Sequence, residues 1–383
     1  NGPHALLYAH YDVQPVDPIE LWDSPPFSPR LVTMPDGRKV IAARGAADDK
    51  GQMMTFIEAL RAWKAVTGSL PARVSVMLEG EEESGSASLK PFMEANAAEL
   101  TPDVAFICDT GMWNSERPAI TTSLRGLVGE EITITAADQD LHSGMFGGPA
   151  RNPIHVLAGI IAALRDDDGR VTIPDFYDGV GEIPEEISRQ WQGLGFDPKE
   201  FLGGVGLSEP AGERNRSVLE QIWSRPTCEV NGIWGGYTQP GFKTVIPSKA
   251  SAKISFRLVG DQDPGKITEN FRAFVRRHVP ADCTLSFTSF GSSPGLRLPV
   301  DGPYLTRARQ ALKDEWGQDP ALVGGGGSIP VAGYFRDVLG VSPLMIGFGL
   351  KDDRIHSPNE KYDLSSFHGG IRSWARILAA LAT

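Results

Sequence analysis

Four glutamates occupy five consecutive positions at the start of the stretch EGEEESGS, residues 79–86, directly after an apolar run at 74–78. Like charges held together raise one another's pKa and cost stability unless something compensates them. Water would compensate them if the stretch formed a loop at the surface, and a bound metal ion would do so directly. The stretch by itself leaves both interpretations open.

Histidines and further carboxylates lie at or beside the ends of other predicted strands. The candidates in this position are His10, Asp12, Asp48, Glu82, Glu83, Asp109 and His356. Open α/β sheets place their sites at the carboxyl ends of their strands. Any one of these residues alone would more often be a solvated loop acid or a core histidine. Two histidines together with several carboxylates suit a divalent ion such as Zn or Mn, so the set favours a metal site.

Such a set of residues can hydrolyse an amide. Two metal ions about 3.5–4 Å apart acidify a water molecule between them and stabilise the developing oxyanion. A carboxylate that does not bind metal can take the proton of that water and pass it to the leaving amine. The adjacent residues Glu82 and Glu83 provide one carboxylate that can bind metal and one that can transfer the proton.

The spacing of apolar residues predicts an α/β protein with an insertion. In the first third, predicted strands at 6–9, 73–78 and 104–108 alternate with predicted helices at 52–66 and 89–100. This alternation indicates a mostly parallel sheet covered by helices. The pattern resumes near Pro303 with a helix to about Trp316, a strand at 342–348 and a helix from Ser365. A proline-rich loop is expected at 15–29.

The middle of the chain has a different pattern. Strands are predicted at 130–136, 227–233, 251–258 and 284–290, and helices at 152–165 and 267–278, whereas 167–224 is polar and irregular. A chain of 383 residues also exceeds what one hydrophobic core usually holds. We therefore expect a catalytic domain formed by residues 1–123 and 302–383, interrupted by a small α+β domain at 124–301.

The composition excludes several classes of partner. Hydrophobic residues make up 41% and charged residues 22% of the chain, as in ordinary globular proteins. The net charge of −11 argues against a nucleic-acid partner, because binding phosphate needs clustered Lys and Arg. No apolar run approaches the roughly 18 residues that span a bilayer, and no signal peptide opens the chain. We therefore expect no membrane partner.

The number and spacing of the cysteines indicate the redox state of the compartment. Cys108, Cys228 and Cys283 are odd in number and widely spaced, which fits a reducing environment and gives no zinc-finger or disulfide pattern. We therefore expect a cytoplasmic protein. The chain begins with Asn1 instead of Met, and an apolar run begins at Ala5, so we expect further residues to precede it in the full-length protein.

The motifs resemble, in order, those of the co-catalytic zinc peptidases. This family includes aminoacylase, glutamate carboxypeptidase, acetylornithine deacetylase, succinyl-diaminopimelate desuccinylase and the carnosinase-type dipeptidases. The matching motifs are His10-x-Asp12, Arg44-Gly45-x-x-Asp48-Asp49-Lys50-Gly51, Glu82-Glu83-x-Gly85-Ser86, Asp109 and Ile355-His356-Ser357. They span nearly the whole chain. The stretch from His10 to Pro15, together with Leu21-Trp22, is most similar to the cytosolic non-specific dipeptidases.

The resemblance implies a role for each motif residue. Asp48 would bridge two divalent metal ions, most typically zinc, with Mn or Co as alternatives. His10 and Asp109 would complete one metal site, and Glu83 and His356 the other. Glu82 would be the general base. Asp12 would hold the far nitrogen of His10. A shift of the motif by one residue, which would make Glu81 and Glu82 the acidic pair, is the alternative; the spacing to Ser84-Gly85-Ser86 favours Glu82 and Glu83.

The resemblance also implies a three-layer catalytic domain with a central mixed, mostly parallel sheet. It further implies an inserted α+β, ferredoxin-like lid that forms a homodimer. His142 of the lid, often contributed by the partner subunit in this family, would help to hold the oxyanion; the alternative is a turn histidine. Arg257 would bind a substrate carboxylate, unless it is an outward-facing strand residue. Asn231 and Thr244 are further candidate substrate contacts. Ser328 lies in a glycine run that lacks the ending of a phosphate loop and would line the substrate pocket.

We therefore predict a two-metal hydrolase that cleaves dipeptides or short peptides. The first alternative is a deacylase of N-acyl amino acids, or a metallocarboxypeptidase, on the same scaffold. A more distant alternative is a metal-binding module without catalysis, or a purely structural protein. The presence of Glu82 counts against loss of catalysis, since an inactive homologue has no reason to keep the base.

Overall fold

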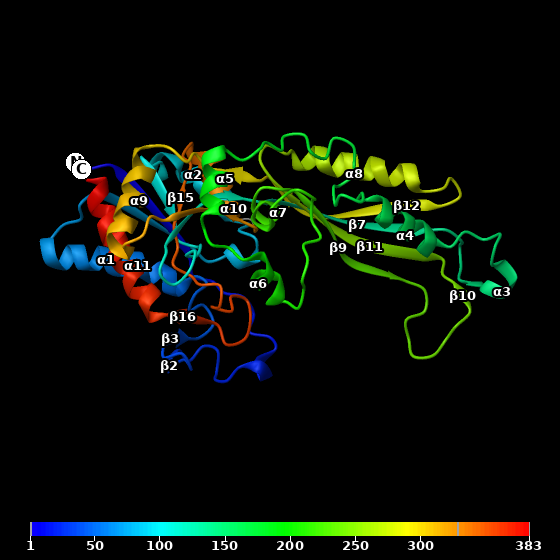
Figure 1. Ribbon diagram of the computed structural model, residues 1–383, viewed down its shortest axis with the longest axis horizontal. Coiled ribbons are helices and arrows are strands. Elements are labelled where there is room, and N and C mark those ends of the chain that lie inside the picture. Colours follow the sequence, from blue (N-terminus) through cyan, green and yellow to red (C-terminus); the bar gives the residue numbers. More distant parts are fainter. Residues whose placement is uncertain (1, 328, 383) are drawn as a thin grey trace. The chain divides into compact units, whose positions relative to one another are not determined.

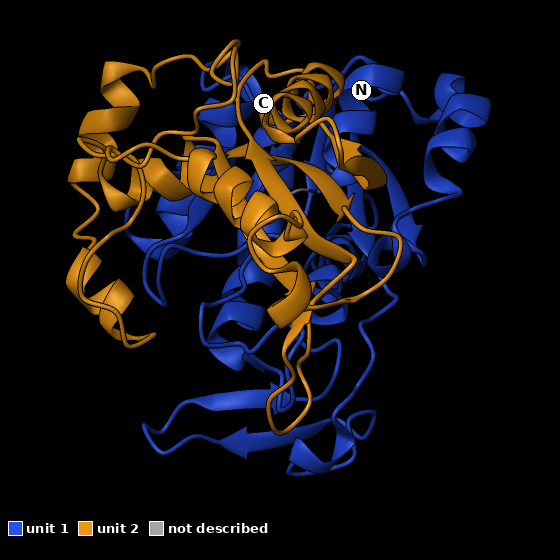
Figure 2. Ribbon diagram, turned by 90° about the vertical axis from the view of Figure 1, so that its right-hand side faces the viewer, with its two compact units in different colours: residues 1–122, 298–323, 329–383 blue, residues 123–297, 324–328 orange. Residues whose placement is uncertain are grey.

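The computed structural model describes residues 2–327 and 329–382. Within these ranges the chain forms two compact units (Figure 2). The first comprises residues 1–122, 298–323 and 329–383, and the second 123–297 and 324–328. The predicted boundaries lie one residue after the first of these divisions (123 against 122) and four after the second (301 against 297). That the two units are independent domains stays a prediction.

The main β-sheet is mixed, as predicted. In chain order its strands are β1 (His4–His10), β4 (Arg73–Glu79), β5 (Val104–Ile107), β6 (Ala119–Leu124), β13 (Leu296–Arg297), β14 (Ala321–Gly325) and β15 (Leu344–Met345). They lie in the order β13-β6-β15-β5-β1-β4, with β14 beside β6. Strands β4, β1, β5 and β15 run parallel, whereas β6 is antiparallel to β15 and β13. The parallel part brings the carboxyl ends of β1, β4 and β5 to one edge.

Helices cover both faces of this sheet. They are α1 (Lys50–Thr67), α2 (Leu89–Leu100), α9 (Pro303–Trp316), α10 (Pro330–Leu339) and α11 (Leu364–Leu381), with short 3-10 turns η1 (Ile19–Leu21) and η2 (Glu82–Ser84). Helix α11 packs on α1 and α9, and α10 packs on α2 (Figure 1).

Aromatic contacts show that the two groups of helices lie on opposite faces. Trp374 of α11 contacts the ring edge of Phe106 of β5, and Tyr8 of β1 contacts Phe335 of α10. Leu7 is paired with Phe106 in register, and neighbouring residues of a strand point to opposite faces. Tyr8 and Phe106 therefore point away from each other. This is the three-layer α/β arrangement that the family resemblance implies.

A small antiparallel sheet also belongs to the first unit. It contains β2 (Arg30–Thr33), β3 (Lys39–Ala42) and β16 (Lys361–Asp363), in the order β16-β3-β2. Sequence analysis did not predict these strands. They matter for the site, because β16 brings the segment after His356 alongside the segment that leads to Asp48.

The second unit has the βαββαβ order of a ferredoxin-like fold. Its elements are β7 (Gly126–Thr135), α4 (Pro153–Ala163), β9 (Thr227–Gly235), β11 (Lys249–Leu258), α8 (Pro264–His278) and β12 (Thr284–Ser293). The strands are antiparallel in the order β12-β7-β11-β9. A short extension carries β8 (Leu141–His142), α3 (Ser143–Phe146) and β10 (Val245–Ile246). The predicted ferredoxin-like insertion is thus confirmed as a fold.

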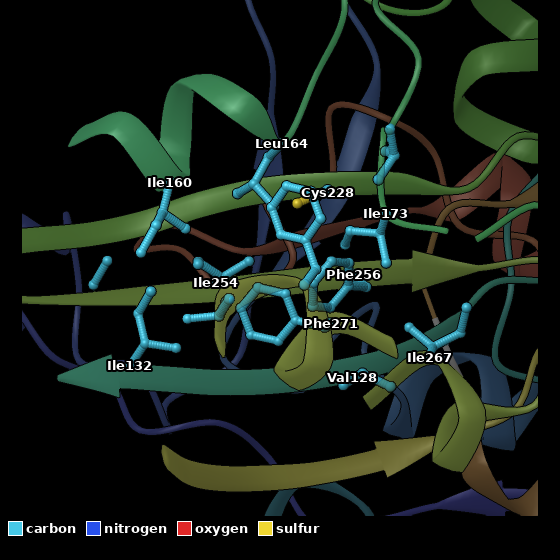
Figure 3. Close-up of a cluster of buried hydrophobic side chains, with 14 of the residues drawn as sticks. Val128, Ile132, Ile160, Leu164, Ile173, Cys228, Ile254, Phe256, Ile267 and Phe271 are labelled. Atoms are coloured by element: carbon cyan, nitrogen blue, oxygen red, sulfur yellow. The ribbon is translucent and has the colours of Figure 1, made fainter. Parts of the chain in front are cut away.

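The core of the second unit lies between this sheet and its two long helices. Val128, Ile132 and Ile254 point from the strands toward Ile160 of α4 and Phe271 of α8 (Figure 3). Both helices begin at an aspartate or asparagine followed by proline, and the Asn or Asp side chain accepts a hydrogen bond from the first turn. The alternation of apolar residues along each strand therefore determines which face the helices cover.

The polar stretch 167–224 is not uniformly irregular, contrary to the prediction. It contains the helices α5 (Glu185–Gln192), α6 (Pro198–Gly203) and α7 (Val218–Trp223). These helices are too short for their periodicity to be distinct. α7 begins with a reciprocal pair of hydrogen bonds between Ser217 and Glu220, a local signal of a helix start.

No helix in the described ranges is both long and apolar enough to cross a membrane.

Candidate metal centre

His10 is the last residue of β1, and it faces two carboxylates. Its Nε2 atom lies 3.0 Å from Oδ1 of Asp48 and 3.9 Å from Oδ2 of Asp109. Asp48 precedes α1, and Asp109 follows β5 by two residues. His10 and Asp109 come from the ends of the parallel neighbours β1 and β5, Asp48 comes from a loop, and the three form one group of possible metal ligands.

A second group forms around His356. Its Nε2 atom lies 2.8 Å from Oδ2 of Asp48 and 3.5 Å from Oε1 of Glu83. Glu83 lies in the 3-10 turn η2, directly after β4. His356 has a φ angle of 63°, a left-handed conformation that is uncommon outside glycine.

Asp48 belongs to both groups. Its Oδ1 atom faces His10, whereas its Oδ2 atom faces His356. One carboxylate with an oxygen in each of two ligand groups is the arrangement of a bridging ligand. The two groups place His10, Asp48, Glu83, Asp109 and His356 together, which is the set that the sequence predicts.

The distances and donors fit a pair of zinc-like ions. Ligand bonds of about 2.0–2.2 Å in tetrahedral geometry place two donors on one ion about 3.4 Å apart. The donor pairs of the two groups lie between 2.8 and 3.9 Å apart. Moreover, Oε1 of Glu83 is buried and accepts no hydrogen bond from any described residue. A buried carboxylate oxygen of this kind is costly unless a cation binds it.

Asp12 and Gln14 support the two ligand groups. The backbone carbonyl of Asp12 accepts a hydrogen bond of 3.2 Å from Nδ1 of His10, and Oδ1 of Asp12 lies 3.3 Å from the same nitrogen. Oδ2 of Asp12 accepts a hydrogen bond of 3.0 Å from the backbone N–H of Glu83. Gln14 donates to Oε2 of Glu83 at 2.6 Å. Asp12 therefore orients one residue of each group. Gln14 is a contact that sequence analysis missed.

Glu82 belongs to neither ligand group. Burial raises the pKa of Glu82 to about 7, even though the charge of His10 lowers it. Glu81 faces elsewhere, since its carboxylate accepts hydrogen bonds from the backbone N–H and the hydroxyl of Ser88. Among the residues of the acidic stretch, Glu83 is thus the one that reaches a histidine, and Glu82 lies beside the group without joining it.

Burial and mutual repulsion also shift the titration of the ligands. Burial raises the pKa of Asp109 well above its usual range, and the charge of Asp48 acts in the same direction. Burial opposes protonation of His10, but its hydrogen bond to Asp48 prevails and raises the pKa of His10 to about 10. Acidic groups that repel one another in a buried site are stabilised when a cation binds between them.

A third acidic group is already paired with cationic side chains of the protein. It consists of Asp352, Asp353 and Asp363. The Nζ atom of Lys361 lies 3.1, 2.7 and 2.8 Å from their carboxylates, respectively. Arg38 also donates to Asp352 and Asp363. This group therefore needs no metal ion.

Two of the predicted lid residues lie together in the second unit. His142 of β8 pairs with Val245 of β10, and the carbonyl of the preceding Thr244 accepts a hydrogen bond from Ser143. His142 and Thr244 are both exposed. Nδ1 of His142 accepts a hydrogen bond of 3.0 Å from the backbone N–H of Gly144, which orients the ring.

Arg257 and Asn231 lie on neighbouring strands. Arg257 is half-buried in β11 and pairs with Thr227 of β9. Asn231 is the extra residue of a β-bulge in β9, because Gly232 pairs with Lys253 whereas Val230 pairs with the next residue, Ile254. A bulge redirects a side chain relative to its neighbours. Ser328 lies outside the described residues.

Arg125 was missed by sequence analysis. Its Nε atom donates to the carbonyl of Gly326, and its backbone N–H to that of Gly327, so it lies beside the glycine run. Burial lowers the pKa of Arg125 to about 10, and the nearby charge of Arg257 acts in the same direction. Two guanidinium groups that repel each other suit an anion such as a carboxylate. The sequence around Arg125 carries no distinct signal of this.

Comparison with known families decides the class of protein. The model of peptidase family M20/M25/M40 matches residues 6–380. The chain belongs to this family. It is therefore a hydrolase of the metallopeptidase class, which confirms the resemblance seen in the motifs.

Alignments with individual members of the family extend over most of the chain. It is 32% identical to the Cys-Gly metallodipeptidase DUG1 of Saccharomyces cerevisiae, in an alignment 386 positions long that covers 97% of this chain and 78% of that protein. It is 30% identical to the Beta-Ala-His dipeptidase of Homo sapiens, in an alignment 383 positions long that covers 98% of this chain and 74% of that protein. The M20 family metallo-carboxypeptidase Sso-CP2 from Sulfolobus solfataricus has a TM-score of 0.86 and 31% identity, covering 99% of this chain and 85% of that one.

Proposed function

We propose that this protein is a two-metal dipeptidase. The observation that supports it best is the position of Asp48, with one oxygen toward His10 and the other toward His356. The proposed ligands are His10, Asp48 and Asp109 for one ion, and Asp48, Glu83 and His356 for the other. The similarity to two named dipeptidases supports the substrate class.

In the proposed reaction the bound metal pair would supply an acidified water and polarise the scissile carbonyl. The remaining work falls to side chains of this protein. The backbone carbonyl of Asp12 accepts a hydrogen bond from Nδ1 of His10, so that Nε2 points toward the ligand group. Glu82 accepts the proton of the attacking water on its carboxylate and returns it to the leaving nitrogen. Arg257, with Arg125 beside it, binds the carboxylate at the end of the substrate.

Zinc is the metal that we propose, with Mn or Co as alternatives. Nitrogen and carboxylate oxygen donors in mixed groups suit zinc well, and they also bind the other two ions. We further propose a cytoplasmic location, since Cys108, Cys228 and Cys283 are all free.

A carboxypeptidase is the second candidate function. It is favoured by the similarity to Sso-CP2, a metallo-carboxypeptidase. The same metal site would serve both reactions, because each cleaves an amide close to a free carboxylate. The difference lies in whether the site also requires the free amino group of a dipeptide.

A substrate panel separates these functions. The protein is stripped of metal with a chelator, reloaded with Zn²⁺ or Mn²⁺, and offered unblocked dipeptides, N-acetyl amino acids and longer peptides. We expect cleavage of dipeptides alone. Cleavage of the acetylated substrates would indicate a deacylase, and release of single residues from the C-terminus of longer peptides would indicate a carboxypeptidase. A metal-loaded protein that cleaves none of them would contradict the proposed function. The metal-loaded E82Q protein is the control for contaminating peptidases.

We also propose that the protein is a homodimer through the second unit. The edge strands β9 and β12 carry exposed apolar side chains, among them Trp234 at 44% and Phe290 at 58% exposure. Nζ of Lys253 lies 5.9 Å from the ring centre of Trp234 and 5.2 Å from that of Phe290, so the three form one patch. In β11, Lys253 lies between Ala252 and Ile254, whose side chains point to the core. Neighbouring residues of a strand point to opposite faces, so Lys253 and this patch lie on the sheet face away from the helices. An exposed apolar patch of this kind is typical of a protein interface.

His142→Ala is expected to lower kcat by about 10²–10³-fold, the usual cost of one oxyanion donor. Both metal ions should remain bound, because His142 belongs to neither ligand group. Metal content and kcat are measured together, with His155→Ala as the matched control, since His155 is an exposed histidine of the same unit. Loss of metal from the H142A protein would instead make His142 a ligand.

Mixing two inactive variants tests whether His142 acts across a dimer. In a mixed dimer of E82Q and H142A chains, one site combines an intact Glu82 from one chain with an intact His142 from the other. Recovery of activity on mixing is expected if the histidine serves the partner's site. Failure to recover activity, when exchange of subunits has been verified with labelled chains, would contradict this role.

A further inference from the structure

Glu360 is a fully buried carboxylate that binds the loop carrying Asp48. We propose that Glu360 is the positioning residue that holds Asp48 in its bridging orientation and couples it to His356. This inference rests on the proposed two-metal site. It concerns the placement of the ligands and assigns Glu360 no contact with metal or substrate.

The contacts of Glu360 account for both of its oxygens. Oε1 accepts hydrogen bonds of 2.8 and 3.0 Å from the backbone N–H groups of Ala47 and Asp48. Oε2 accepts bonds of 2.9 Å from the backbone N–H of Gly45 and from Nη1 of Arg44. Backbone N–H groups that converge on one carboxylate form an anion-binding nest. One of these backbone N–H groups belongs to Asp48 itself, so Glu360 holds the backbone of the proposed bridging ligand.

Two glycines of the loop permit this arrangement. Gly45 has a φ of 80°, and a Cβ atom there would lie 2.7 Å from a methyl group of Val13. A Cβ atom on Gly51 would lie 2.0 Å from the carbonyl oxygen of Ala46. The loop therefore closes tightly enough to direct its N–H groups at Glu360.

The same residue is linked to the second ligand group through the chain. Glu360 follows His356 by four residues, and its carbonyl accepts a hydrogen bond of 3.1 Å from Ala43. His356 and Asn359, the residue before Glu360, both have a φ of 63°, in the left-handed region. Such conformations cost free energy and persist where surrounding contacts hold them. The side chain of Asn359 provides one set of contacts, to the backbone of Leu21 and Asp23, and Glu360 provides the other.

Arg44 compensates the charge of Glu360. Its side chain is as buried as that of Glu360, donates to Pro15 through Nη2, and lies over the ring of Trp22. A buried ion pair that also makes hydrogen bonds is costly to break from one side. A neutral side chain in place of Glu360 would therefore affect the loop in two ways. It would leave Arg44 unpaired, and it would offer fewer acceptors to the N–H groups.

Glu360→Gln tests the inference by metal binding instead of catalysis. The amide keeps one acceptor oxygen and turns its NH₂ group toward two donors, so either Arg44 and Gly45 or Ala47 and Asp48 lose their partner. We expect the affinity for Zn²⁺ to fall by about 10–100-fold, as for other residues that orient metal ligands. The measurement is equilibrium dialysis of the metal-stripped chain against Zn²⁺ alone, with the visible spectrum of Co²⁺-loaded protein as a second readout.

Glu315→Gln is the matched control. Glu315 is also a largely buried carboxylate of the first unit, with two arginine partners, Arg372 and Arg376. Among the described residues, neither its ion pairs nor its hydrogen bonds involve a proposed metal ligand. This variant loses the charge of a buried carboxylate that pairs with two exposed arginines, and it should keep the wild-type affinity for Zn²⁺. Thermal unfolding of both metal-stripped variants shows whether each remains folded.

Glu360→Asp covers the case in which the glutamine variant does not fold. It retains the charge beside Arg44 but is shorter by one methylene, so it cannot reach all four donors, and its affinity for Zn²⁺ should also fall. Wild-type affinity in either folded Glu360 variant would overturn the positioning role. A wild-type chain that itself fails to bind two Zn²⁺ ions would overturn the proposed metal site instead, so the two failures are distinguishable.

Discussion

Glu82→Gln is expected to lower kcat by about 10²–10⁴-fold, the usual contribution of a general base. The amide retains the shape of the side chain but cannot accept the proton of the attacking water. Because Glu82 belongs to neither ligand group, the variant should still bind both metal ions. The measurement is kcat for a dipeptide together with the metal content of the same sample.

Glu81→Gln is the control that separates the two possible bases. Glu81 binds the backbone and side chain of Ser88, so its replacement should leave kcat close to the wild-type value. If E82Q turned over normally and E81Q did not, Glu81 would be the base. Loss of metal from E82Q would instead place Glu82 among the ligands.

Asp48→Ala is expected to abolish binding of the metal pair. Each oxygen of Asp48 faces a different histidine, so its removal takes one ligand from each group at once. The two groups would then retain His10 with Asp109, and Glu83 with His356. Metal per chain, measured by mass spectrometry after dialysis against Zn²⁺, should fall from two ions to at most one, and peptide hydrolysis should be lost with it.

Asp352→Ala is the matched control for this loss. Asp352 belongs to the acidic group that surrounds Lys361, and its carboxylate is paired with a cation of the protein. Its removal should leave the metal content unchanged. An Asp48→Ala protein that kept two ions would refute the bridging role and shift attention to Glu83 and Asp109 as the shared ligands.

Much of the fold could be predicted because strong periodicity marks long elements. The predicted helix at 89–100 is α2 (Leu89–Leu100), and the helix from Pro303 to Trp316 is α9. The inserted α+β domain followed from strands and helices of ordinary length, and the family resemblance implied its ferredoxin-like order. Elements with little local signal were missed or misjudged. The strand predicted at 342–348 is shorter in the structure, where β15 covers only Leu344–Met345. The apolar run indicates burial, and a buried segment need not pair with a neighbouring strand along its whole length.

Other elements depend on contacts with distant segments. β14 (Ala321–Gly325) runs into the glycine run, where strand propensity is low, and it forms because it pairs with β6. The hairpin of β2 and β3 follows a proline-rich loop, and β3 is extended by β16, more than 300 residues later in the chain. Pairing of this kind has no signature in either segment alone.

The sequence by itself determined which residues meet at the candidate site. His10 ends a strand, and Glu83 and Asp109 follow strands, that run parallel; the carboxyl ends of parallel strands share one edge of a sheet. Only the tertiary structure decided how the ligands are held. That Asp48 turns one oxygen to each histidine depends on the buried carboxylate of Glu360, 312 residues away in the chain. Hydrogen bonds and burial of this kind depend on distances in space, and the order of residues alone does not reveal them.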